Sequence, residues 1–133
     1  MKQFLLALIL GGILYAAPHG PTKAEANQPL TAEDKIALQS ALLDFFEQGG
    51  DADGTFRIID RTTGDMLKMH TGALHPRIIT LGPDYVVCIQ LFDTSGQGHE
   101  ADFVMRRGSG GWIVTDVLLN QRDLLKKARS QLK

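Results

Sequence analysis

Residues 77–119 read RIITLGPDYVVCIQLFDTSGQGHEADFVMRRGSGGWIVTDVLL. Runs with a period of two are separated by three short turn sequences, GPD at 82–84, TSGQG at 94–98 and GSGG at 108–111. This pattern predicts strands over 77–81, 85–93, 99–107 and 112–119. Strands that are joined by such short loops pair as antiparallel neighbours, so the four strands form a meander.

The alternation of side chains indicates which faces of these strands are buried. Residues 85–92 are apolar on both faces apart from one glutamine, which predicts a central strand that is covered on both sides. In the following strand Phe103 lies on an apolar face and Asp102 on the other. In the last strand simple alternation places Asp116 on the same face as Trp112.

A helix and a hairpin precede the meander. Thr31 has the sequence context of an N-cap, Asp34 completes an approximate capping box, and apolar residues recur at helical spacing as far as the Gly49-Gly50 pair. We therefore predict a helix over residues 31–48. Strands are then expected at 55–60 and 66–70, on either side of a TTGD turn.

A second helix is expected after the meander, over residues 121–132, with Asn120 as its cap. Five basic and one acidic side chain make residues 121–133 strongly basic. The predicted class is α+β: an N-terminal helix packed on a curved antiparallel sheet, and then a short basic helix. The sheet consists of the four-stranded meander and a preceding strand or hairpin.

The first residues have the features of a secretory signal. Lys2 is followed by an uncharged apolar run from Phe4 to Ala17, which is shorter than the about 20 residues that a membrane span needs. Cleavage is expected after Ala26, in preference to Ala17, which is followed by proline. An uncleaved N-terminal anchor is the alternative. The prediction is a Sec-type signal over residues 1–26 and a periplasmic or secreted single domain over residues 27–133.

Charge and cysteine content limit the function classes. The whole chain has a net charge of −1, and loss of Lys2, Lys23 and Glu25 with the signal changes it to −2. This balance and the export route argue against nucleic-acid binding. Cys88 is the only cysteine, so an internal disulfide cannot form. Its neighbours YVV and I predict a buried, inert thiol.

The order of these elements, closing on GGWIVTDV at residues 110–117, resembles the nuclear transport factor 2-like or ketosteroid-isomerase-like superfamily. A cystatin-like helix-on-sheet fold shares this order. The chain departs from the first family by having one clear helix before the sheet and a helix after it. The resemblance implies a fold that can form a pocket, and it does not imply a reaction.

Acid–base chemistry in such a pocket would use Asp116, with His99 or Asp102 as its partner, because a general acid needs a carboxylate in an apolar setting. His70, His75, His99 and Cys88 offer metal-ligating atoms, but they lack a paired-ligand spacing, so neither a metal nor a cofactor is expected. The GDADG sequence at residues 50–54 lacks the ligands of a calcium loop and indicates a turn.

These observations favour an exported, non-enzymatic domain that binds a small apolar ligand or a protein partner. The first alternative is a small pocket enzyme of the isomerase or hydratase type that uses Asp116 with His99 or Asp102. The second is a peripheral envelope protein that the basic C-terminal helix holds on an anionic membrane surface. The oligomeric state is left open.

Overall fold

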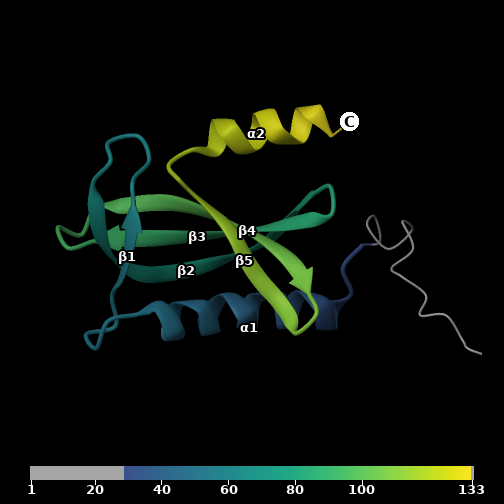
Figure 1. Ribbon diagram of the computed structural model, residues 1–133, viewed down its shortest axis with the longest axis horizontal. Helices are drawn as coiled ribbons and strands as arrows, with labels where there is room; N and C mark the ends of the chain where they lie inside the picture. The colour runs from purple at the N-terminus through teal and green to yellow at the C-terminus, as the bar shows by residue number, and fades with distance from the viewer. Residues whose placement is uncertain (1–28, 133) are drawn as a thin grey trace, which may run out of the picture.

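The chain forms an α+β fold in the computed structural model, which describes residues 29–132 (Figure 1). A long helix lies along one side of a curved antiparallel sheet, and a short helix lies on the other side. The elements in chain order are α1 (Ala32–Gly49), β1 (Phe56–Ile59), β2 (Met66–Leu81), β3 (Asp84–Asp93), β4 (Gly98–Gly108), β5 (Gly111–Leu119) and α2 (Arg122–Gln131).

The first helix begins where its sequence predicts. Thr31 is the N-cap: its hydroxyl oxygen accepts a hydrogen bond from the Asp34 backbone N–H at 3.1 Å, and the Asp34 carboxylate bonds back to Thr31. This reciprocal pair satisfies backbone donors that the first helical turn leaves unpaired. The predicted capping box is therefore confirmed.

The strands pair in sequence order from β1 to β5, which gives the sheet two edges. We call the side that packs against α1 the inner face, and it carries Val87, Ile89 and Phe103. We call the side under α2 the outer face, and it carries Val86, Cys88 and Val104. Because β3 is buried on both of these faces, the predicted central strand is confirmed.

The main core lies between α1 and the inner face. Phe46 of α1 is close to both Phe103 and Phe56, with ring centroids 5.2 and 4.8 Å apart, respectively. Leu42 and Leu38 lie one and two turns before it, respectively, and are fully buried. The apolar stripe of the helix therefore covers the concave side of the sheet.

The second strand differs from its prediction. Residues 66–70 and 77–81 were expected to form two strands, but they belong to one strand, β2, that continues through Gly72 and Pro76. Two register shifts against β3, between Thr71 and Leu74 and between Leu74 and Ile78, accommodate the residues between the expected strands. Only Met66–Met69 pair with β1, so Pro76 lies where no ladder hydrogen bond to that strand is needed.

The face predicted for Asp116 is wrong. A register shift in β5 makes Met105 pair with Val114 and Val104 pair with Asp116, so that Thr115 is an extra residue. An extra residue reverses the alternation beyond it. Asp116 therefore lies on the outer face, opposite Val104, and Trp112 packs against the core of the inner face.

The predicted cap of the last helix is also wrong. Gln121 occupies the N-cap position of α2 and makes no side-chain capping bond. Asn120 is a left-handed residue with φ of 53°, and its side chain accepts a hydrogen bond from the Glu100 backbone N–H at 3.1 Å. It therefore fastens the end of β5 to β4 instead of capping the helix.

The predicted export signal at residues 1–26 lies outside the described residues. Within residues 29–132, no helix has both the length and the apolar character that crossing a membrane requires.

We expect Phe103→Ala to lower the free energy of unfolding by about 3–5 kcal/mol, because it removes a fully buried ring that α1 packs against. Ile36→Ala, on the exposed side of α1, is the control and should change it by less than about 0.5 kcal/mol. Urea denaturation followed by circular dichroism measures both values. Equal losses in the two variants would show that α1 does not pack on the sheet in solution.

Candidate functional site

A buried polar cluster lies on the outer face below the start of α2. Cys88 of β3 and Asp102 of β4 are directly opposite one another in the sheet, and they are 4% and 1% exposed. The Cys88 thiol donates a hydrogen bond to Asp102 Oδ1 at 2.9 Å. Burying an ionised carboxylate is costly unless a partner compensates its charge.

Arg122 supplies that charge from the first residue of α2. Its Nε donates to Asp102 Oδ2 at 2.9 Å and its Nη2 donates to Asp102 Oδ1 at 3.0 Å, which is a bidentate arrangement. The same Nη2 contacts Cys88 Sγ. Both oxygens of Asp102 are therefore occupied, and the cluster fastens α2 to the sheet.

The thiol in this cluster is protonated. Burial, reinforced by the hydrogen bond to Asp102, raises the pKa of Cys88 to about 12. The reactive form of cysteine is the thiolate, so a thiol with this pKa is a poor nucleophile at neutral pH. The predicted burial of Cys88 is confirmed, and its contacts with Asp102 and Arg122 were not foreseen.

His99 lies on the inner face, and both of its ring nitrogens have a hydrogen-bond partner. Its register partner is Leu91, a residue of the inner core, whereas Asp102 pairs with Cys88 on the outer face. Nε2 donates to Asp93 Oδ2 at 3.0 Å, and Nδ1 lies 2.8 Å from Asn120 Nδ2. The side-chain oxygen of Asn120 accepts the Glu100 backbone N–H, so its amino group faces His99 and donates to Nδ1. Nδ1 is therefore the nitrogen without a proton, and the ring proton is assigned to Nε2.

Asp116 has a different set of partners. Its carboxylate accepts a hydrogen bond at 2.6 Å from Arg61, in the turn between β1 and β2, and another from the Val117 backbone N–H. Its side chain is 41% exposed. The structure therefore gives each of the three predicted acid–base residues its own separate partners and does not bring them together around one cavity.

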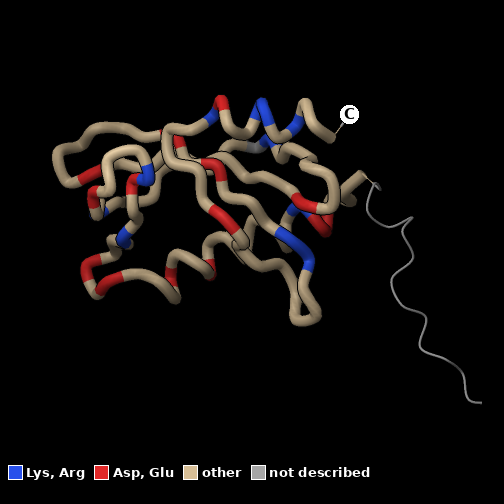
Figure 2. Tube along the Cα trace, turned by 45° about the horizontal axis from the view of Figure 1, so that its top comes forward, with Lys and Arg blue, Asp and Glu red and all other residues tan. Residues whose placement is uncertain are grey.

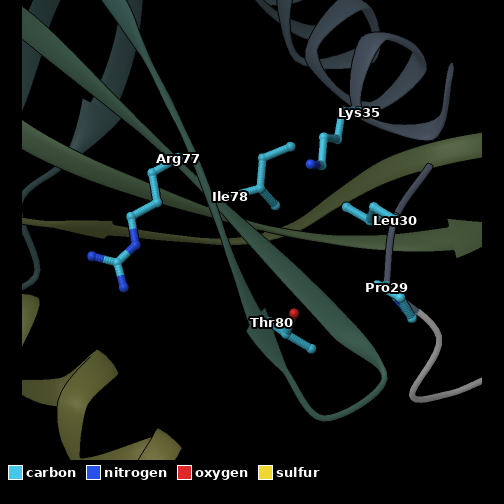
Figure 3. Close-up of a pocket in the computed structure, with 6 residues that line it drawn as sticks. All are labelled: Pro29, Leu30, Lys35, Arg77, Ile78 and Thr80. Carbon is cyan, nitrogen blue, oxygen red and sulfur yellow. The ribbon is translucent and has the colours of Figure 1, made fainter. Parts of the chain in front are cut away.

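A pocket of about 330 Å³ lies at the edge of β2, in a part of the chain that sequence analysis did not select (Figure 3). Its lining consists of the segment before α1, one residue of α1 and the last third of β2, namely Pro29, Leu30, Lys35, Arg77, Ile78 and Thr80. The sequence pattern assigns Lys35 to a helix and residues 77–80 to a strand, and it assigns no regular structure to Pro29 and Leu30. Only the pairing of the strands shows that they meet at an open edge.

The open edge follows from the lengths of the first two strands. β1 has four residues and covers Met66–Met69 of β2, which has sixteen. Within the described part of the chain, no strand pairs with the edge of β2 that faces away from β3 between residues 70 and 81. Backbone N–H and C=O groups on that side are therefore available to another chain.

The basic helix presents less charge than its sequence suggests. Arg122 is turned toward Asp102, and Lys126 pairs with Asp123 at 3.1 Å. Lys127 and Arg129 are the remaining exposed cations of α2. Figure 2 shows the Lys and Arg positions of this helix in blue. This partial neutralisation weakens the argument for a membrane contact through α2.

No group of three or more His, Cys, Asp or Glu side chains within residues 29–132 is arranged to hold a metal ion. Comparison of the chain with models of known protein families, with curated proteins and with solved structures finds no match. The outer-face cluster and the β2 edge are therefore the two features from which a function can be inferred.

We expect Arg122→Met to lower the free energy of unfolding by about 3 kcal/mol, because it leaves a buried carboxylate without its charge partner. Arg129→Met, on the same helix, is the matched control. The double variant Asp102→Leu with Arg122→Met should recover most of the loss, because it removes the buried charge as well. Urea denaturation measures the stability of all these variants. A double variant as unstable as Arg122→Met would contradict this role for the ion pair.

The pKa of Cys88 predicts a loss of stability in alkali. Its ordinary pKa is 9.0, so between pH 9 and pH 12 the unfolded chain releases a proton that the folded chain keeps, and stability falls as the pH rises. Cys88→Ala lacks this contribution, so the stability difference between unmodified protein and variant should shrink over this range. Denaturation of both proteins at pH 8 and pH 10.5 measures it. A difference that is constant with pH would refute the prediction.

Proposed function

We propose that this chain is an exported, non-enzymatic domain that binds a protein partner along the unpaired stretch of β2. The observation that carries the proposal is the open edge over residues 70–81, which has a pocket beside it. An extended segment of a partner can add to such an edge as another strand, with backbone hydrogen bonds providing affinity and pockets providing specificity. A protein segment suits this site better than a small apolar ligand, because two of the six lining residues are basic.

The positions of the predicted acid–base residues favour binding over catalysis. A general acid needs an apolar setting that keeps its carboxyl protonated, whereas Asp116 faces Arg61 and solvent. Asp102 is bound on both oxygens, and His99 is held by Asp93 and Asn120. Each of these side chains has a structural partner, so stability is sufficient to explain its presence.

Export and ancestry belong to the same proposal. The signal-like features of residues 1–26 support export to the periplasm or the medium. The helix-on-curved-sheet arrangement is compatible with a nuclear transport factor 2-like or cystatin-like origin. The nuclear transport factor 2-like superfamily hosts binding modules as well as enzymes, so such an origin would be compatible with a binding role.

A photo-crosslinking residue at Thr80 tests the proposal, with the same residue at Thr94, in the β3–β4 turn, as the control. Both threonines are exposed. In cells of the source organism, illumination should link position 80, and not position 94, to one partner protein. The protein should be recovered from the exported fraction with Asn27 as its first residue. Adducts of equal yield at the two positions, or at neither, would count against the β2 edge as the binding surface.

A further inference from the structure

Two cations border the open edge of β2, and neither has an acidic partner in the described part of the chain. Among residues 29–132, no carboxylate lies within salt-bridge distance of Lys35 or Arg77. Two acidic residues near them in the fold are already paired: Asp34 with Arg107 and Asp84 with Arg106. The pocket therefore has an uncompensated positive charge that a ligand can neutralise.

The two cations stand on different sides of the edge. Ile78 is opposite Val87, an inner-face residue, and Arg77 precedes it, so alternation turns Arg77 to the outer side. Figure 3 shows Arg77 and Ile78 pointing away from each other, with Lys35 and Leu30 on the side of Ile78. The inner side of the edge is thus apolar with one cation at its rim. On the outer side Ile79 and Leu81 pack against the outer-face cluster, and Arg77 is the exposed residue beside them.

This arrangement matches the period of an added strand. Successive side chains of an extended segment point to opposite faces of the sheet it joins. Every second residue of the segment would meet Leu30 and Ile78, and the residues between would lie on the side of Arg77. We propose that the edge of β2 binds a segment of another protein in which apolar and acidic residues alternate. This inference rests on the proposed function, and it specifies the chemistry of the partner.

The charge of the edge also argues against a second copy of this chain as the occupant. The β2 edge of a second copy has no acidic residue between positions 70 and 81, so it would offer Arg77 no counter-charge. The other long edge of the sheet is less open. The β1–β2 turn reaches it, with Arg61 on Asp116 and with Thr62 accepting a hydrogen bond from Gln121, just after β5.

Three capped peptides of about eight residues test the inference: VEVEVEVE, VQVQVQVQ and VKVKVKVK. Their binding is measured by isothermal titration calorimetry with the protein purified in the form that accumulates in its source organism. We expect the Val–Glu peptide to bind about tenfold more tightly than the Val–Gln peptide, and the Val–Lys peptide to bind most weakly. The backbone amides within residues 72–80 that point away from β3 should gain protection from hydrogen exchange when the Val–Glu peptide is added, and those of β5 should not.

Charge-reversed variants identify the side chains responsible. Arg77→Glu and Lys35→Glu should each remove the preference for Val–Glu, and together they should favour Val–Lys. Lys35 lies in the first turns of α1, where a glutamate is compatible with the helix dipole, so this variant should fold. Lys127→Glu, on the exposed side of α2, is the matched control and should leave the order of the three peptides unchanged.

The outcomes separate the inference from the proposed function. Equal binding of Val–Glu and Val–Gln, with protection at residues 72–80, would overturn the acidic partner and leave the β2 edge as a binding surface. Binding of none of the peptides at millimolar concentration would overturn both. A dimer that protects residues 72–80 without peptide would show that a second copy occupies the edge, and it would also overturn the inference.

Discussion

The two-sided burial of β3 is the constraint on which the rest of the structure depends. From Tyr85 to Ile89 its side chains are buried without interruption, although successive residues point to opposite faces of the sheet. A sheet whose central strand is apolar on both faces is stable only when both faces are covered. The helix α1 covers the inner face with a wide apolar stripe, and α2 has to cover the outer face.

The helix α2, which covers the outer face, is attached to the sheet in a different way from α1. Leu125 is the one buried residue of α2, so this helix contributes little apolar surface. The bidentate contact of Arg122 with Asp102 gives the attachment its direction, and Cys88 completes the cluster from the neighbouring strand. A buried ion pair adds little net stability, but it fixes where the helix lies, because any other position leaves Asp102 uncompensated.

The open edge is a consequence of unequal strand lengths. β2 has to be long because it pairs with β3 from one end to the other, and its bulges keep Met69, Leu74 and Ile78 on the inner face. β1 is only four residues long, between the turn after α1 and the turn at residues 60–65. The part of β2 beyond β1 remains unpaired, next to the start of α1, and there the fold brings Leu30, Lys35 and Arg77 together. The proposed binding site is this unpaired part of β2.

The sequence by itself determined the class of fold, the order of the elements apart from the continuity of β2, the capping box at Thr31 and Asp34, and the burial of β3. These features are local, since they depend on the side-chain period and on turn residues within a few positions of one another. Tertiary structure alone decided three other features: the bulge at Thr115 that turns Asp116 outward, the contact of Arg122 with Asp102 across 20 residues, and the open edge. Each depends on how two distant segments align, and strand register is set by the packing of the whole sheet, which no local pattern records.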